Sequence, residues 1–521
     1  MKKKNDMVTP DALKSNRVRN SARSLLMGVF TTLLTTMAPF LVRMLMLRYL
    51  GEEYVGLNNV LQSVVWILNI TESGIGPVMV FFLYRPAAEG NLELVNSYLM
   101  EIRNLYRFVA TVIFTVGMLM LPFLPVLVSG EVPEGENIYV LFLGYLTAIV
   151  TQYLLWPEMA SILAAFQRLD LQYVITILTN AAAYVCQVAA ICIWHNFMAY
   201  VWIVFFQAIG TGVLQLLFGR HFFKDCYPCG CLERKQRKEV KKRIFSMFGH
   251  QMDEKMLGSV DNLFVSSMLG LRMVAVYGNY MYVVTAVSMM INTVYQAVLS
   301  GIGNAMVVES RESNEVRFDC MFFLSSLLAG WSTACMLCMY QTFMELWMPG
   351  HLLPFGTMAL FCFFSYLTQM RRCTQTFKNA GGMWHSDRFK PYAAMLADLV
   401  LDFVLIRIAG VQGAVAATIL CVGAIEFTWE TCVLYKDYFQ KSVRGYVRSF
   451  LKYTGINAVL CVTVYLLTGL TLSDRGICAL VSRAAACTGF SILFYFVVYR
   501  KNEMMRIWKN TVPEMFQKSY K

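Results

Sequence analysis

The sequence predicts an all-α polytopic membrane protein with about fourteen transmembrane helices, arranged as two homologous six-helix lobes followed by two C-terminal helices. Three observations support this fold class: the composition, an internal repeat and an uneven distribution of basic residues. The 521 residues are 57% hydrophobic and only 15% charged, with a mean hydropathy of +0.51. Since soluble domains carry about 25% charged residues, this chain lacks the polar side chains needed to cover a soluble surface.

Apolar stretches long enough to cross a bilayer as helices, about 20 residues each, follow one another along the chain. The residue-by-residue alternation of a membrane β-barrel is absent. We expect spans at 24–47, 55–83, 107–128, 138–163, 172–194, 198–219, 246–269, 274–300, 319–342, 353–377, 391–408, 411–434, 450–470 and 477–499. The seventh of these carries the most charge.

An internal repeat relates the two halves. Ser-Gly-Ile-Gly occurs at 73–76 and again at 300–303, and Met follows three residues after each copy. A second match precedes each copy. Leu50-Gly51 and Val55-Gly56 stand before the first copy, and Leu269-Gly270 and Val274-Ala275, with the same spacing between them, stand before the second. Repeats of this length indicate two homologous halves, an arrangement common among membrane transporters.

The repeat and the spans together predict six segments. They are a cytoplasmic N-terminal segment (1–23), an N-lobe (24–219), a basic cytoplasmic inter-lobe loop (220–245), a C-lobe (246–435), two further helices (436–499) and a cytoplasmic tail (500–521). The first apolar stretch is too long for a cleaved signal peptide, so we expect it to remain as the first span.

The basic residues predict the orientation, because Lys and Arg in short loops stay on the cytoplasmic side. With the N-terminus inside, all but seven of the 45 basic residues are cytoplasmic, so both termini are predicted to be cytoplasmic in a multi-pass protein of the cell membrane. The seven are Arg43, Arg48, Lys255, Arg272, Arg407, Arg475 and Arg483. The net charge of +12 then reflects this bias and attraction to membrane lipids, and it predicts no nucleic-acid binding.

The inter-lobe loop contains two unusual groups of residues. The run Glu233–Arg243 is either an amphipathic helix on the inner headgroups or a solvated linker that obeys the same charge rule. Cys226, Cys229 and Cys231 crowd together beside His221 without the regular spacing of a zinc site. We therefore expect no bound metal and no cofactor.

Phosphate-binding loops, nucleophile elbows and HExxH motifs are absent from the sequence, and the five His are dispersed. We therefore expect no enzyme activity. Charges inside spans are costly in lipid, which makes them the candidates for function.

The first span carries the candidate substrate-binding residues. Thr32, Thr36 and Arg43 are spaced four and seven residues apart, so they share one helix face with a cation near its outer end. Arg43 is expected either to attract a phosphate group in a wet cavity or to reach the outer headgroups. By the repeat offset Arg43 corresponds to Asn262, which lies seven residues after Lys255, and both join the candidate set.

The seventh and eleventh spans carry the candidate ion-coupling residues. Asp398 and Asp402 are four residues apart on one face near the bilayer centre, where two carboxylates repel unless a proton or a cation lies between them. Glu254 and Asp261, seven residues apart in the seventh span, are the expected additional contributors. A structural pair bonded to neighbouring hydroxyls is the alternative.

A series of motifs extends over most of both halves: Arg43 with Leu50-Gly51, Tyr54-x-Gly56-Leu57-Asn58, Glu72-Ser-Gly-Ile-Gly76, Tyr227-Pro228, Asp261-Asn-Leu-Phe-Val-Ser-Ser-Met-Leu-Gly270, Val276-Tyr-Gly-Asn-Tyr280, Gly301-Ile-Gly-Asn304, and Gly410-x-x-Gly413 with Thr418. Together these motifs resemble the Firmicutes-type polysaccharide flippases of the multidrug/oligosaccharidyl-lipid/polysaccharide exporter superfamily. The resemblance implies two six-helix lobes around a central cavity, two extra helices and alternating access. In related lipid-linked peptidoglycan-precursor flippases, sodium is held by acidic and amide groups on the seventh and eleventh helices. Two Asp replace the usual pair here, which leaves Na⁺ and H⁺ both open as the coupling ion.

We therefore expect a flippase that moves an undecaprenyl-diphosphate-linked oligosaccharide from the inner to the outer leaflet for cell-surface polysaccharide assembly. The expected partners are this lipid-linked substrate, membrane lipids and other polysaccharide assembly proteins. A cation-coupled multidrug exporter is the closest alternative. A membrane-embedded polysaccharide polymerase or ligase would need a long extracytoplasmic catalytic loop, and a purely structural partner of the glycan machinery stays open.

Overall fold

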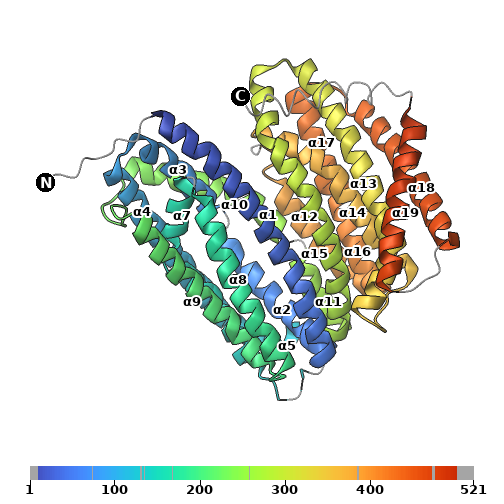
Figure 1. Cartoon of the computed structure of the whole chain (residues 1–521), viewed down its shortest axis with the longest axis horizontal. Coiled ribbons are helices and arrows are strands. Elements are labelled where there is room, and N and C mark those ends of the chain that lie inside the picture. The colour runs from blue at the N-terminus through green and yellow to red at the C-terminus, as the bar shows by residue number, and fades with distance from the viewer. Residues whose placement is uncertain are drawn as a thin grey trace. The chain divides into compact units, whose positions relative to one another are not determined.

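The computed structural model describes residues 10–72, 74–128, 132–133, 135–166, 168–256, 258–383, 386–471 and 476–500. Every regular element in these ranges is helical, which confirms the predicted all-α class (Figure 1). The chain divides into two compact units between Ser259 and Val260. The finer subdivision into lobes, loop and extra helices stays a prediction.

The first unit contains the first copy of the repeat. Its helices are α1 (Pro10–Tyr49), α2 (Glu52–Leu68), η1 (Asn69–Glu72), α3 (Ile75–Glu89), α4 (Leu92–Met120), η2 (Leu121–Phe123), α5 (Leu124–Leu127), α6 (Ile138–Leu154), α7 (Pro157–Ala165), α8 (Leu169–Cys192), α9 (Phe197–Phe222) and α10 (Arg234–Met256). Helix α8 packs between α1 and α9, which lie side by side with it in Figure 1. Helices α6 and α9 approach closely at Gly144, where a Cβ atom would lie 2.7 Å from Val201 Cγ1.

Two stretches of the first unit that are long and apolar enough to cross a membrane are broken helices. Helix α2 passes through η1 and then Gly74, whose φ of 93° favours glycine, before α3 continues the span. Helices α6 and α7 meet at an angle of 52°. Pro157 explains this bend, because its ring disfavours helical geometry at the preceding residue, and Trp156 adopts a positive φ of 53° there.

The described part of the second unit is also helical. Its helices are α11 (Ser259–Leu269), α12 (Leu271–Val308), α13 (Arg311–Trp347), α14 (Phe355–Ala380), α15 (Lys390–Ala409), α16 (Val411–Leu420), α17 (Thr428–Val433), α18 (Arg444–Thr471) and α19 (Ile477–Tyr499). Two π-helical segments, η3 (Cys421–Phe427) and η4 (Leu434–Phe439), make α16 to η4 one continuous rod. Helix α13 packs against α14, α18 and α19.

Among the described residues, ten helices are long and apolar enough to cross a membrane, or eleven if the bent pair of α6 and α7 is one span. The predicted spans at 246–269, 353–377 and 391–408 have no counterpart among them. Helices α14 and α15 fall short because they carry three and four charged residues, and α11 has only 11 residues. A multi-pass membrane protein is confirmed, and the count of about fourteen stays a prediction.

The predicted seventh span is not one helix. Helix α10 starts at Arg234, inside the predicted loop, and ends at Met256, and α11 starts at Ser259 after Gly258, whose φ is 79°. The seven-residue spacing therefore does not stack Glu254 over Asp261, or Lys255 over Asn262, on a single helix. That spacing argument was wrong because glycine lets the backbone turn between the two helices.

Candidate functional site

Three buried carboxylates converge in the second unit. Asp261 on α11 and Asp398 and Asp402 on α15 each offer one oxygen atom, and these atoms all lie within 4.8 Å of one another. Their side chains are 0%, 2% and 0% exposed. The expected pairing of Asp398 with Asp402, and the approach of Asp261 to this pair, are both present in the structure.

Helix α15 positions two of the carboxylates. Asp398 and Asp402 are one turn apart and so share a face. The chain then reverses at Gly410, whose φ is 57°, and enters α16. At Gly413 a Cβ atom would lie 1.9 Å from the carbonyl oxygen of Leu405, so only glycine allows the two helices to approach this closely.

Two hydroxyl groups hold Asp261 in the cluster. Tyr277 on α12 donates a hydrogen bond of 2.5 Å to Asp261 Oδ2, and Thr418 on α16 donates one of 3.0 Å to the same atom. Thr418 Oγ1 also lies 3.0 Å from the carbonyl oxygen of Ala414 on its own helix. Four helices, α11, α12, α15 and α16, therefore meet at the carboxylates.

The carboxylate oxygens of the cluster are only partly satisfied by hydrogen bonds. Within the described residues, neither carboxylate oxygen of Asp402 receives a hydrogen bond, and Asp261 Oδ1 receives none. Three ionised carboxylates this close repel strongly in a buried site unless protons or a cation lie among them. Carboxylate and hydroxyl oxygens are also the ligands that hard cations prefer. The arrangement is thus chemically suited to bind a proton or a metal cation.

Arg43 lies in a separate polar cluster of the first unit. Its guanidinium donates a hydrogen bond to the Asn59 side chain on α2, so it is directed into the unit. The neighbouring Asn58 accepts hydrogen bonds from Gln62, at 3.1 Å, and from Tyr145 on α6. Helix α1 is continuous through Pro39, as the predicted helix face requires.

The other candidate residues lie in varied surroundings. Thr36 is 7% exposed, whereas Thr32 is exposed and bonds the carbonyl oxygen of Gly28 at 2.9 Å. Asn262 is half-buried beside Asp261. The side chains of Glu254 and Lys255 lie outside the part of the chain that the structure describes.

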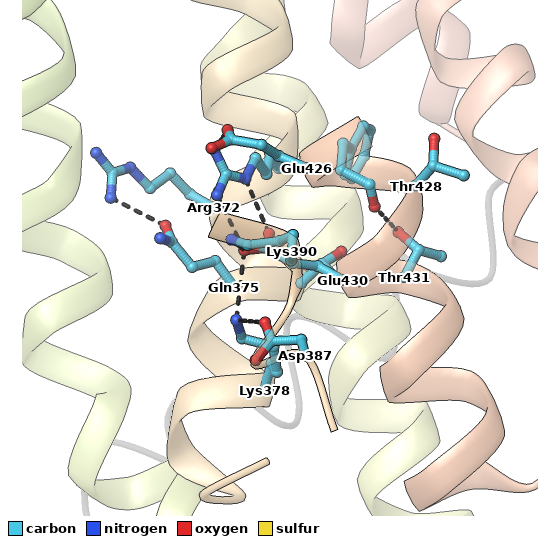
Figure 2. Close-up of polar contacts among 12 residues, drawn as sticks. Arg372, Gln375, Lys378, Asp387, Lys390, Glu426, Thr428, Glu430 and Thr431 are labelled. Carbon is cyan, nitrogen blue, oxygen red and sulfur yellow. Dashed lines mark hydrogen bonds and ion pairs between the residues drawn. The ribbon is translucent and has the colours of Figure 1, made fainter. Parts of the chain in front are cut away.

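The sequence analysis missed a buried ion network in the second unit (Figure 2). Arg371 on α14 donates two hydrogen bonds to Glu430 on α17, at 2.8 and 2.9 Å, and a third to Glu426 on η3. Lys378 pairs with Asp387, and both Lys378 and Lys390 reach Glu430 Oε1, at 3.4 and 2.8 Å. Three cations thus face three carboxylates.

The network holds the helix that carries the carboxylate cluster. Lys390 is the first residue of α15, eight residues before Asp398, which is about 12 Å along a helix. A sequence signal was available: Arg371, Glu426 and Glu430 all lie within predicted spans, and the two Glu are four residues apart. Charges of opposite sign in neighbouring spans indicate mutual pairing.

The fold is shared with solved transporter structures. It is similar to a structure described as the lipid II flippase MurJ in an inward closed conformation, with a TM-score of 0.67 and 13% identity over 92% of this chain and 98% of that one. It also resembles an inward-facing multidrug resistance MATE family transporter of the MOP superfamily, with a TM-score of 0.61 and 14% identity over 77% of this chain and 93% of that one.

A third similar structure is a mutant of the Vibrio cholerae MATE transporter VcmN, with a TM-score of 0.55 and 11% identity over 82% of this chain and 100% of that one. At these identities the likeness establishes the fold, which is that of MOP-superfamily transporters. No protein with a curated functional description matches the sequence.

The sequence model of the family described as "Polysaccharide biosynthesis protein" matches residues 21–300, more than half of the chain. The chain belongs to the polysaccharide biosynthesis protein family. The resemblance inferred from Arg43, Asp261 and the glycine motifs is thereby confirmed at the level of the family.

Proposed function

We propose that this protein is a flippase that moves an undecaprenyl-diphosphate-linked oligosaccharide from the inner to the outer leaflet of the cell membrane. Alternating access between two lobes would expose the substrate first to one side and then to the other. The physical problem is that a sugar chain and a diphosphate cannot cross hydrocarbon unaided. The product would supply cell-surface polysaccharide assembly, in company with other assembly proteins, and both termini would be cytoplasmic.

The observation that carries this proposal is the buried cluster of Asp261, Asp398 and Asp402 in a chain of the polysaccharide biosynthesis family. A purely structural protein would be destabilised by three adjacent buried carboxylates without gaining anything from them. In a transporter the same cluster binds Na⁺ or H⁺, and the free energy of the ion gradient drives the conformational change. The substrate diphosphate is assigned to the first unit, with Arg43 as its cation and Thr32 and Thr36 on the same helix.

The experiment uses purified protein in liposomes that contain a fluorescent polyprenyl-diphosphate oligosaccharide. The rate at which a membrane-impermeant reagent gains access to the labelled lipid reports transfer between leaflets. We expect acceleration over protein-free liposomes, and a further increase when either a sodium or a proton gradient is imposed. Transfer no faster than in protein-free liposomes would contradict the proposal, and growth of the sugar chain would identify a polymerase.

A cation-coupled multidrug exporter is the second candidate, because the fold is also that of multidrug resistance transporters. The same liposomes distinguish the two functions. An exporter would accumulate a cationic dye in response to the gradient and would leave the lipid-linked sugar in its original leaflet. Arg43 favours the flippase, since a half-buried cation attracts diphosphates and repels cationic drugs.

A further inference from the structure

The first turns of α10 form a strongly basic surface that the proposed transport function does not use. Between Glu233 and Arg243 there are seven cations and two carboxylates. Six of the cations are exposed, and five of them make up what is called here the α10 basic face: Arg234, Lys235, Lys238, Lys241 and Lys242. The cations therefore point away from the unit and toward whatever surrounds it.

The opposite side of α10 is fixed to the first unit. Arg237 donates a hydrogen bond of 3.0 Å to Glu101 on α4, and Val240, three residues further along, is fully buried. The loop that leads into α10 is attached to the same helix, because Asn96 on α4 accepts a hydrogen bond of 3.0 Å from the backbone N–H of Tyr227. The basic face is thus held in one orientation and is not a freely moving linker.

Exposed aromatic residues lie beside these cations. The guanidinium of Arg243 lies 4.0 Å from the centre of the Phe81 ring on α3. Phe81 and Tyr84 are 50% and 48% exposed, and Phe245 at the end of the face is 80% exposed. Helix α3 belongs to a stretch, Glu52–Glu89, that is long and apolar enough to cross a membrane.

This combination indicates where the surface lies. Aromatic side chains and basic residues together are typical of the level where hydrocarbon gives way to headgroups. Since α3 both crosses the membrane and contacts Arg243, the α10 basic face lies at that level. A soluble partner that bound only through acidic groups would not bury the exposed rings of Phe81 and Phe245.

We propose that the α10 basic face binds the phosphate groups of anionic phospholipids, with Phe245 entering the boundary of the hydrocarbon. The binding partner is the membrane surface itself, and the inference does not depend on which substrate the protein transports. Each cation near an anionic surface contributes roughly a fivefold change in affinity. The face therefore distinguishes anionic from zwitterionic lipid.

The test uses full-length protein in a neutral detergent, with its native Cys replaced and an environment-sensitive fluorophore attached to Phe245→Cys. Titration with short-chain phosphatidylglycerol is expected to shift the emission to the blue, and high salt is expected to reverse the shift. The triple variant Lys238→Gln/Lys241→Gln/Lys242→Gln should raise the titration midpoint by at least about tenfold. The triple Lys→Arg variant at the same positions keeps the charge and should keep the midpoint.

Three outcomes would overturn the proposal. One is an unchanged midpoint in the triple Gln variant, whose elution and thermal unfolding should match the parent protein. Another is an equal response to short-chain phosphatidylcholine, which carries no net charge. The third is a response to a soluble acidic peptide or to a lipid-linked diphosphate sugar but not to phosphatidylglycerol. The fluorescence titration does not depend on transfer of the lipid-linked sugar. Its result would therefore stay interpretable if the flippase proposal failed.

Discussion

Tyr277 donates a hydrogen bond of 2.5 Å to Asp261, and the two residues are sixteen positions apart across the break at Gly270. In the first unit Arg43 bonds Asn59, also sixteen positions away, across the break at Gly51. In each unit the helix before the break therefore bonds the helix after it, at positions one residue out of register, because the repeat offset pairs Arg43 with Asn262. The first unit uses a cation in its contact, and the second unit uses a carboxylate.

The carboxylate cluster predicts loss of ion coupling when one charge is removed. Asp398→Asn and Asp402→Asn keep the shape of the side chain and weaken cation or proton binding among the remaining acids. We expect at least a tenfold lower response of transport to an imposed sodium or proton gradient in liposomes, with substrate binding retained. Asp437→Asn, at an exposed carboxylate of the same unit, is the control and should respond like wild type. Full gradient response in both cluster variants would assign a structural role to the pair.

The hydroxyl groups around Asp261 predict a change in ion affinity when one of them is removed. Tyr277→Phe removes one donor to Asp261 Oδ2, and a hydrogen bond to a charged group contributes about 1.5–3 kcal/mol. If the ion is sodium, the concentration needed for half-maximal transport should rise by about tenfold, because Asp261 loses a contact that positions it. If the ion is a proton, the concentration needed should fall, because the ionised carboxylate loses a donor that stabilises it. Tyr280→Phe loses a comparable hydrogen bond of 2.8 Å to Gln341, away from the carboxylates. An equal shift in both variants would indicate general loosening of α12.

Arg43 is predicted to bind the substrate diphosphate. Arg43→Ala should abolish transfer of the lipid-linked oligosaccharide while the protein stays folded, and Arg43→Lys should recover only part of it because an ammonium lacks the planar fork of donors. Leaflet transfer in liposomes and thermal unfolding are the two measurements. Arg85→Ala, at an exposed arginine of the same unit, serves as the control. Normal transfer by Arg43→Ala would leave Arg43 as a structural partner of Asn59.

The buried ion network predicts a large change in stability. Glu430→Gln leaves Arg371 and Lys390 without their shared carboxylate, and breaking a buried pair in this way typically costs about 3–5 kcal/mol. We expect a clearly lower midpoint of thermal unfolding in detergent. The double variant Glu430→Gln/Lys390→Met removes one buried cation as well and should recover part of the loss. Glu89→Gln, at the exposed pair with Arg85, should leave the midpoint unchanged.

The basic-residue asymmetry predicts the orientation in the membrane. In a Cys-depleted background, Tyr139→Cys and Leu352→Cys should react with a membrane-impermeant thiol reagent added outside cells, because both side chains are exposed next to predicted extracytoplasmic loops. Lys238→Cys, exposed on α10, should react only after the membrane is opened. Reaction of Lys238→Cys from outside would invert the predicted topology.

Hydropathy and charge in the sequence predict the all-helical membrane class and most of the spans. The four-residue spacing of Asp398 and Asp402 predicts their shared face, because that distance is local to one helix. The approach of Asp261 to them was expected from helix order in a resembling family. The break at Gly258 was not foreseen, because a single glycine within an apolar stretch is compatible with both a continuous and a broken helix.

The ion network was missed for a different reason. Arg371, at the inner end of a predicted span, was counted with Lys378 and Lys390 among the cytoplasmic charges. Counting the basic residues of loops does not test whether a cation has a partner. Finding the network requires knowing that α14, α15 and α17 are neighbours, which depends on long-range packing. Local sequence patterns do not contain that information.

The two π-helical segments make the length of the rod from α16 to η4 critical. Thr428 Oγ1 bonds the carbonyl oxygen of Gly423, five residues back, at 2.9 Å, so one extra residue is accommodated in this wide turn. Deleting a single residue between Cys421 and Phe427 would let the turn close to an ordinary α-helix. The later side chains would keep their direction, because an α-turn with one residue fewer covers the same rotation as the wide turn. A deletion in α16, where no extra residue is accommodated, would instead turn Glu430 by about 100° away from Arg371 and uncouple the rod from the helix that holds Asp398 and Asp402.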